Sequence, residues 1–530
     1  MEEAMKTLGL NPYLPFWETV PDGEPHEFGG RIYIYGSHDT LGGSTFCDQD
    51  YVCWSAPVED PGNWRYEGVI YSKMQDPLNG APYDSAQHGG KKIPSIPMPF
   101  GDQEHPHYLY APDLAQGPDG RFYLYYALDF VGVISVAVSD SPAGPFEFLD
   151  FVTYEDGRIP EEGIKFDPGI LSEPGGNYLY YGFAPQFKFP GQGEVPGALM
   201  VQLADDMHTI ITDPLCVANG FDTAKGTDYE EHPFFEASSI RHYGDWYYFV
   251  YSSLQGNELC YGMSRTPGGH FDFKGVIVSN GDLGYKGNTL PTNYMGNNHG
   301  GLVQAGDKFY IFWHRHINGT QYSRQGCANE VHFAEDGTIP QIEVTSCGLN
   351  GGPLPARGVY QTYIACHLTE ADRTKVGNNI LVGPGEPVPP LPEGQPYITT
   401  EPLGGDAADA PVSIPAKICT AENGGGNVDI DSPAPAALRP LIANLRAGSV
   451  AGFKYFAFDG KETTIRAMLR GEGILEVRAD APDGQVISVL QASSGDWTDC
   501  TAPLMGQSGT HALYFRTSEG KLDFAEFELC

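Results

Sequence analysis

The sequence predicts an all-β protein: a five-bladed β-propeller followed by a small antiparallel β-sandwich of the jelly-roll kind. A Gly-containing turn leads five times into a strand of alternating aromatic and aliphatic residues, at intervals of roughly 55 to 90 residues. These copies are residues 29–37, 119–127, 175–183, 243–253 and 305–315. A second strand and a Pro/Gly turn ending in an aromatic follow most of them, which is the rhythm of a four-stranded blade. We find no helical periodicity over three turns, so an α/β barrel is not expected.

The character of the chain changes after about residue 350. We assign residues 1–378 to the propeller, 379–412 to a Pro/Gly-rich linker and 413–530 to the sandwich. Period-2 alternation and turns such as APDGQ predict the antiparallel strands of this last part. A chain of 530 residues is also too long for one hydrophobic core, which favours at least two domains.

Composition limits the partners and the compartment that we expect. The net charge of −37 repels nucleic acid and anionic membranes, so neither is an expected partner. The N-terminus lacks the basic start and apolar run of a signal peptide. The ten cysteines form no CxxC pair and no zinc spacing, as expected for reduced thiols. We therefore expect a cytoplasmic protein without an organic cofactor.

A single polar group precedes each of the five aromatic strands. In chain order these groups are Glu24, Asp113, Asp167, Glu236 and His299. The innermost strand of each blade lines the propeller axis, so these side chains should converge there. The last three lie at one constant distance before Tyr178, Tyr247 and Tyr310. A single Asp before a turn is more often a turn residue, but identical register in three blades favours a shared function.

The first blade is interpreted as departing from that register. Its sequence EPHEF–GGRIYIYG matches DPGILSEPGGNYLYYG if three loop residues are missing, which places Glu24 over Asp167. Asp22, two residues earlier in PDGEP, is the competing acid, and turn chemistry is the alternative interpretation of it. We prefer Glu24.

Three carboxylates at one centre suit the cleavage of glycosidic bonds. One must be protonated to release the leaving oxygen, and a second must be ionised to activate water or to attack carbon. A third nearby raises the pKa of the acid by like-charge repulsion. This pattern indicates a reaction class without naming a sugar.

The motifs that carry these acids resemble those of glycoside hydrolase family 43 over roughly residues 11–350. They are APDL (111–114), FDPGIL (166–171), FFEASSI (234–240) and NNHGGLV (297–303). The resemblance implies a five-bladed propeller that acts with inversion on arabinose- and xylose-containing glycans. It also implies Glu24 as general base, Asp167 as the pKa-modulating and substrate-orienting acid, and Glu236 as general acid. Glu24 departs from the family pattern, which has Asp there.

Further roles follow from the same resemblance. It implies that His299 contacts a Ca²⁺ ion or a water cluster on the axis, and that Arg324 lies near the substrate. His38 and Asp39 follow the first inner strand and are expected to reach a sugar hydroxyl. The C-terminal part resembles a family 6 carbohydrate-binding module, although a bracing role is at least as strongly favoured. Core packing is the expected role of Trp17, Trp54 and Trp313.

These observations predict an exo-acting, inverting glycosidase that removes α-L-arabinofuranosyl units from plant-type oligosaccharides. A β-D-xylosidase or another furanosidase, acting for example on galactofuranose, is the alternative within the same fold. A non-catalytic carbohydrate-binding propeller is the alternative from another class. A retaining enzyme would require the two carboxyl groups to lie only about 5–5.5 Å apart.

Overall fold

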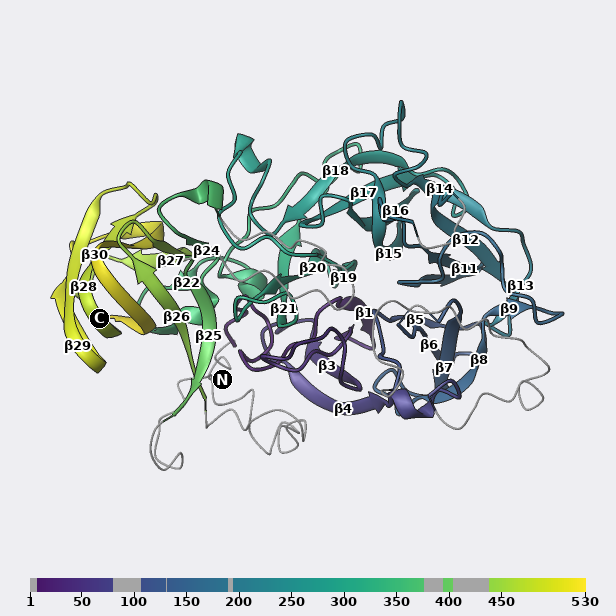
Figure 1. Cartoon of the computed structure of the whole chain (residues 1–530), viewed down its shortest axis with the longest axis horizontal. Coiled ribbons are helices and arrows are strands. Elements are labelled where there is room, and N and C mark those ends of the chain that lie inside the picture. Colours follow the sequence, from purple (N-terminus) through teal and green to yellow (C-terminus); the bar gives the residue numbers. More distant parts are fainter. Residues whose placement is uncertain (1–6, 80–105, 130, 189–193, 376–393, 404–437) are drawn as a thin grey trace.

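The computed structural model describes residues 7–79, 106–129, 131–188, 194–375, 394–403 and 438–530. Five sheets surround a common centre, and a sixth, larger sheet forms the C-terminal part beside them (Figure 1). The predicted all-β architecture, with five blades followed by a sheet-rich region, is confirmed. The inner strands β1, β5, β10, β15 and β19 lie nearest the centre of the ring.

The first two blades are four-stranded and antiparallel, as predicted. The first holds β1 (Glu24–Phe28), β2 (Arg31–Tyr35), β3 (Tyr51–Pro57) and β4 (Arg65–Tyr71). The second holds β5 (Asp113–Gln116), β6 (Phe122–Ala127), β7 (Ile134–Ser139) and β8 (Glu147–Phe151). Their middle strands are almost wholly buried because aromatic and β-branched side chains pack on both faces between neighbouring blades.

The remaining blades vary in strand number. The third holds β10 (Gly169–Glu173), β11 (Gly176–Tyr181), β12 (Gly197–Leu203) and β14 (Leu215–Asn219), extended by β13 (Thr209–Ile210) and β9 (Thr153–Tyr154). The fourth holds β15 (Phe234–Tyr243), β16 (Trp246–Ser253), β17 (Glu258–Ser264) and β18 (Asp272–Ser279). The fifth holds β19 (Leu302–Ala305), β20 (Lys308–His316) and β21 (Arg324–Val331). Short 3₁₀ turns occupy Lys73–Gln75, Tyr285–Gly287, Gly348–Asn350, Thr362–Ile364 and Arg373–Lys375.

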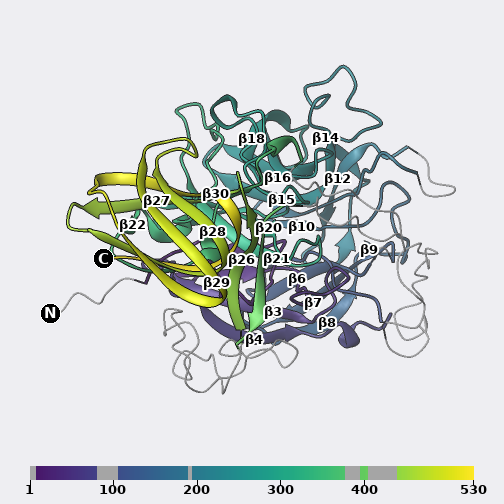
Figure 2. The same cartoon turned by 60° about the vertical axis from the view of Figure 1, so that its left-hand side comes forward.

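The C-terminal part is one nine-stranded sheet that folds over itself through long, bent strands (Figure 2). Its early strands are β22 (Leu354–Pro355), β23 (Gly358–Gln361), β24 (His367–Thr369) and β25 (Tyr397–Pro402). Its later strands are β26 (Leu438–Arg446), β27 (Val450–Asp459), β28 (Thr464–Ala479), β29 (Val486–Pro503) and β30 (Ser508–Leu529). The 22-residue β30 pairs with four other strands, which lets one strand serve both layers.

The sheet pairing shifts the predicted domain boundary. Strands β22, β23 and β24 lie before residue 378, yet they pair with β27 and β30. Within the predicted linker, β25 pairs with β26, whereas 379–393 and 404–412 lie outside the described residues. The sequence pattern alone placed these short strands in the propeller. Their partners lie up to 171 residues away, and a local pattern carries no information about such pairing.

The two parts share one hydrophobic cluster. It runs from Trp54 and Phe312 in the propeller to Phe453 and Phe527 in the C-terminal sheet. The buried Arg315 on β20 donates to the backbone carbonyls of Tyr363 and Ala365. Because apolar side chains of both parts are buried in this one cluster, the C-terminal part braces the propeller.

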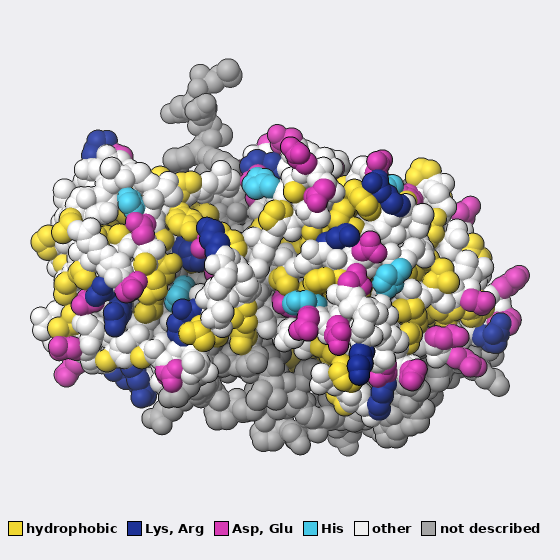
Figure 3. All heavy atoms as spheres, turned by 90° about the horizontal axis from the view of Figure 1, so that it is seen from above, with side chains coloured by type: hydrophobic (Ala, Val, Ile, Leu, Met, Phe, Trp, Pro, Cys, Tyr) yellow, Lys and Arg dark blue, Asp and Glu magenta, His cyan; other side chains and the backbone are white. Residues whose placement is uncertain are grey.

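Acidic side chains and unpaired cysteines mark the described part of the chain. On the face in Figure 3, acidic side chains spread over the propeller half, and basic ones stand singly or in small groups among them. All cysteines within the described ranges are free. None of the helices in those ranges has the length and apolar character that a membrane crossing needs.

Candidate active site

Two layers of side chains meet at the propeller axis, and the strand register decides which residue belongs to which layer. Glu24, Asp113 and Gly169 are the first residues of their inner strands, and they stand opposite Tyr35, Tyr125 and Tyr180. Asp22, Ala111 and Asp167 come two residues earlier in each case. Because the register is equivalent in successive blades, the residues that precede the strands form an upper layer, which holds Asp22, Ala111 and Asp167. The first residues of the strands form a lower layer directly beneath it.

The register predicted for the first blade was wrong. Strands β1 and β2 pair through a turn as short as that between β10 and β11, so no loop residues are missing. Asp22 precedes Tyr33 by eleven residues, the spacing at which Asp167 precedes Tyr178. Asp22, and not Glu24, is therefore the positional counterpart of Asp167. Counting back from Tyr33 in the sequence would have found it.

Asp22 is held as an ionised carboxylate by a buried arginine. Both carboxylate oxygens accept hydrogen bonds from Nη1 of Arg324, at 2.9 and 3.1 Å. Nδ1 of His314 lies 3.2 Å from Asp22 Oδ1. Burial alone would raise the pKa of Asp22, but the Arg324 guanidinium, followed by the His314 ring, outweighs it and holds that pKa well below the usual range.

The pKa of Glu236 is shifted in the opposite direction from that of Asp22. Its side chain is partly exposed, whereas Asp22 and Asp167 are buried. Burial of the carboxyl group and then the charge of Asp22 raise the pKa of Glu236 to about 8, against the opposing effect of Arg324. Glu236 therefore keeps its proton at neutral pH while Asp22 does not.

Asp167 and His299 complete the upper layer. The Asp167 Oδ2 atom accepts a hydrogen bond from the backbone of Ala237 at 2.9 Å and lies 3.6 Å from Nδ1 of His299. Burial and then the nearby Glu236 raise the pKa of Asp167. Burial lowers the pKa of His299 to about 4, so its ring is neutral at pH 7. Asp22, Asp167 and Ala237 all have positive φ, at 56°, 45° and 69°, a strained backbone that is typical of functional sites.

Glu24 lies in the lower layer, inside an ion-pair network. Its Oε2 accepts hydrogen bonds from Nη2 of Arg241 at 2.7 Å and from the Ser239 hydroxyl at 2.9 Å. Nη1 of Arg241 also lies 4.0 Å from Asp113, whose Oδ1 contacts His26 at 2.7 Å. Burial raises the pKa of Glu24 to about 8 in spite of Arg241.

A glycine makes this layer possible. A Cβ atom at Gly301 would stand 2.3 Å from Glu24 Oε2 and 2.6 Å from the Ser239 hydroxyl. The fifth blade therefore needs a residue without a side chain at position 301. Gly301 occupies the same place, two residues after the upper-layer residue, that Glu24 occupies after Asp22.

The predicted sugar-binding residues His38, Asp39 and Arg324 are buried behind the carboxylates. Arg324 bridges Asp22 and Asp39, with its Nε 2.8 Å from Asp39 Oδ2. His38 is fully buried, and its Nε2 lies 3.0 Å from Glu18. Direct contact of His38 or Asp39 with a sugar stays a prediction, and in this structure both support the walls of the site. Trp17, Trp54 and Trp313 are buried, as the core interpretation expected.

Sequence reasoning missed two residues of the site. The sequence indicates no more than packing or hydrogen bonding for His314, and it singles out no role for Arg241. A charged residue within the apolar inner strand FFEASSIRHY was the available signal for Arg241. His314 had no comparable signal, because only the fold brings the end of β20 against the turn that carries Asp22.

Comparison with known proteins places this geometry in a family. The model for "Glycosyl hydrolases family 43" matches residues 95–339. A "Xylosidase/arabinosidase" of Thermoclostridium stercorarium is 42% identical over 537 residues, which cover 99% of this chain and 100% of that protein. The chain belongs to glycoside hydrolase family 43. It is therefore a glycosidase, as the sequence predicted.

More distant relatives cover the propeller or the whole chain. A "Xylosidase/arabinosidase" of Bacteroides ovatus is 26% identical over 62% of this chain and 97% of its own length. Among solved structures, a family 43 arabinoxylan arabinofuranohydrolase from Bacillus subtilis, in complex with cellotetraose, aligns over 99% of both chains. It shows 19% identity and a TM-score of 0.46.

Proposed function

We propose that this family 43 enzyme is an inverting exo-glycosidase that removes terminal α-L-arabinofuranosyl units from plant-type oligosaccharides. The observation that carries the proposal is the opposite tuning of two neighbouring carboxyl groups. Arg324 holds Asp22 ionised, whereas the pKa of Glu236 is raised to about 8, so that Glu236 stays protonated at neutral pH. An acid and a base whose environments push their pKa values apart are the pair that glycoside hydrolysis requires. The same pair argues against a binding protein without activity.

The proposed reaction is a single displacement. Glu236 donates its proton to the glycosidic oxygen as the bond from that oxygen to the anomeric carbon breaks. Asp22 takes a proton from a water molecule, whose oxygen forms the new bond to the same carbon from the opposite face. Afterwards Asp22 carries the proton and Glu236 is ionised, and exchange with solvent restores both. The family resemblance implies that Asp167 modulates the pKa of the acid and orients the substrate, and we keep that role for it as a proposal.

Glu24 is poorly suited to be the base in this scheme. Its Oε2 is already bound by Arg241 and Ser239, and its pKa of about 8 leaves it largely protonated at neutral pH. We therefore assign the base to Asp22 and give Glu24 a supporting role beneath it.

β-D-Xylosidase activity is the second candidate function. The 42% identical relative is named for both xylose and arabinose, and a 25% identical protein of Xylanibacter ruminicola is named "Beta-xylosidase". Both substrates end in a pentose, and the site described above does not separate them. The cytoplasmic location that we expect favours short imported oligosaccharides over polymers as substrates.

A panel of nitrophenyl glycosides tests the sugar, and the product anomer tests the mechanism. We expect the highest kcat/KM on the α-L-arabinofuranoside, a lower value on the β-D-xyloside and the lowest on the β-D-galactofuranoside. Proton NMR within the first minutes should show the β-anomer of arabinose from the α-linked substrate. Release from the xyloside alone would reverse the order of the two candidates, and an α-anomer would contradict inversion.

The pH dependence follows from the two carboxyl groups. We expect kcat/KM to be flat through neutral pH and to fall above about pH 8, because Glu236 then loses the proton that it must donate. The acidic fall should lie below the usual range of an Asp, since Arg324 lowers the pKa of Asp22. Measured pKa values belong to the coupled Glu236–Asp167 pair. An alkaline fall centred below pH 6 would contradict these assignments.

His299 in the upper layer and Glu24 in the lower layer fit the axial Ca²⁺ that the family resemblance implies. His299 Nε2 lies 4.0 Å from Glu24 Oε1, and that oxygen is buried without a hydrogen-bond partner among the described residues. Ca²⁺ takes six to eight oxygen ligands, so Glu24 Oε1 and water would supply oxygen to such an ion, and His299 would face it with a ring nitrogen or through water. When bound, the ion would supply positive charge beneath the carboxyl groups.

A further inference from the structure

A histidine, a glutamate and a cysteine meet in the fourth blade, two strands out from the propeller axis. Glu258 and Cys260 are two residues apart on β17, so their side chains point to the same face of the sheet. His232 lies just before β15, in the segment that leads to Glu236. A ring nitrogen of His232, the Cys260 sulfur and a Glu258 carboxylate oxygen all lie within 4.8 Å of one another.

These three donor atoms are spaced nearly as a zinc ion would hold them. A tetrahedral Zn²⁺ ion lies about 2.0–2.3 Å from its ligand atoms and so keeps them about 3.3–3.7 Å apart. The Cys260 Sγ atom lies 3.4 Å from Glu258 Oε1, which fits that spacing. His232 Nδ1 lies 2.6 Å from the same oxygen, so the ring must move slightly outward. The His232 side chain is 28% exposed and stacks on the Phe273 ring, along which it can slide.

The donor set suits Zn²⁺ and not Ca²⁺. Ca²⁺ takes oxygen ligands, whereas Zn²⁺ accepts imidazole, thiolate and carboxylate together. The Ser253 hydroxyl donates to Glu258 Oε1 at 2.6 Å and orients the carboxylate, as partners behind a metal ligand commonly do. Cys260 is fully buried in the apolar cluster that also holds Phe271, whereas His232 opens to solvent. An ion and one water molecule can therefore reach the three ligands from the histidine side.

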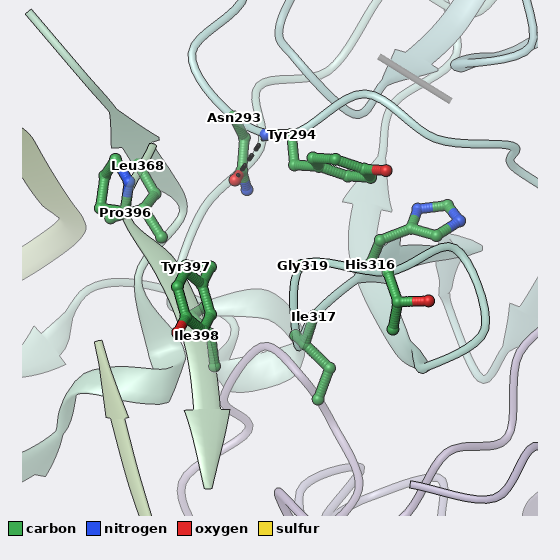
Figure 4. A pocket seen from close by; sticks show the side chains of 10 residues that line it. Asn293, Tyr294, His316, Ile317, Gly319, Leu368, Pro396, Tyr397 and Ile398 are labelled. Carbon is green, nitrogen blue, oxygen red and sulfur yellow. Dashed lines mark hydrogen bonds between the residues drawn. The ribbon is translucent and has the colours of Figure 1, made fainter. Parts of the chain in front are cut away.

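Other metal-ligating side chains do not combine in this way. The lower layer at the axis brings together Glu24, His26 and Asp113, which include no thiol. The pocket in the seam between β25 and the propeller contains His316, but no carboxylate or thiol is among the side chains that line it (Figure 4). Within the part of the chain that the structure describes, a nitrogen, an oxygen and a sulfur ligand come together only in the fourth blade.

We propose that His232, Glu258 and Cys260 bind one Zn²⁺ ion, with a water molecule as the fourth ligand. Burial raises the pKa of the Cys260 thiol, so without a metal the thiol keeps its proton. On binding, that proton passes to solvent, and bonds from the ion to His232 and Glu258 replace the hydrogen bond between them. The ion ties the segment before β15 to β17, four residues ahead of Glu236. No step of the proposed reaction passes through it.

Cobalt substitution tests the site, because Co²⁺ takes the same kinds of ligand as Zn²⁺ and absorbs visible light. We expect the reduced, metal-free protein to bind about one Co²⁺ ion per chain. The spectrum should show the visible bands of a four-coordinate ion and a near-ultraviolet charge-transfer band from the thiolate. Zn²⁺ should remove both signals, whereas an excess of Ca²⁺ should not. Zn²⁺ should also raise the temperature of thermal unfolding, since the ligands are assembled only in the folded chain.

Variants assign the signal to these residues. Cys260→Ser should abolish the charge-transfer band and weaken Zn²⁺ binding about a hundredfold or more. His232→Gln should weaken Zn²⁺ binding to a similar extent, and its exposed position keeps the test available if Cys260→Ser does not fold. Cys216→Ser is the matched control, because Cys216 is an exposed free thiol on β14 of the neighbouring blade. It should keep the band and the affinity, as should Glu24→Gln at the axis.

Three results would overturn the inference. They are a wild-type protein without the charge-transfer band, an unchanged band in Cys260→Ser, and an unchanged Zn²⁺ affinity in His232→Gln. Each would mean that the three side chains form only a hydrogen-bonded cluster. A band that disappears in Cys216→Ser would place the metal at a surface thiol and would also contradict the proposal. Glycosidase activity is measured separately, so its presence or absence decides nothing about this site.

Discussion

Replacing Asp22 by asparagine should lower kcat by about three orders of magnitude, with a much smaller change in KM. The general base of a glycosidase contributes about 10²–10⁴-fold, and an amide cannot accept the proton of the attacking water. The substitution is nearly isosteric. Arg324 keeps both of its hydrogen bonds to Asp39, so the surrounding structure should persist. Steady-state kinetics on nitrophenyl arabinofuranoside measure the effect, and thermal unfolding checks the fold.

Glu24→Gln is the matched comparison, because it removes the other first-blade carboxylate. We expect a loss of less than about tenfold in kcat, since Glu24 lies in the lower layer and acts only through its neighbours. A loss of three orders of magnitude in Glu24→Gln, with Asp22→Asn nearly as active as wild type, would restore Glu24 as the base. The pair of variants thus decides between the two residues.

The sequence was sufficient for the blades because their signal is local. A turn followed by an alternating aromatic strand recurs five times, and period-2 alternation with buried middle strands is how a blade packs. Asp167, Glu236 and His299 could be placed at the axis for the same reason. The prediction for the first blade was wrong because it assumed that three loop residues were missing. The turn there has the same length as in the third blade.

What the sequence could not predict depends on contacts between distant segments. Arg324 and Asp22 are 302 residues apart, yet their ion pair sets which carboxylate is ionised. The pairing of β23 with β30, which moves the domain boundary, joins residues up to 171 positions apart. Neither pairing leaves a pattern in the local sequence, because the two partners become neighbours only in the folded protein.

Replacing Arg241 by methionine should destabilise the propeller by about 3–5 kcal/mol, the usual cost of removing one partner of a buried ion pair. Arg241 is 8% exposed and its guanidinium hydrogen-bonds Glu24 and the backbone carbonyls of Pro25 and Leu302. Without it, the Glu24 and Asp113 carboxyl groups lose the cation between them. Urea unfolding, followed by tryptophan fluorescence, measures the change. Arg265→Met is the control, because its pair with Asp245 is exposed and worth about 1 kcal/mol at most.

A second substitution tests whether the unpaired charge is the cause. Asp113 is the ionised partner of Arg241, since its pKa is lowered, so adding Asp113→Asn to Arg241→Met should recover part of the loss and make the two changes less than additive. In the wild type the lowered pKa of Asp113 adds stability that is lost as the pH falls below the ordinary pKa of an aspartate, near 3.9. The cost of Arg241→Met should shrink over the same pH range, because the variant already lacks part of that stability. If the cost is independent of both pH and Asp113, lost packing of the arginine stem explains it, and the lower layer is not held together by charge.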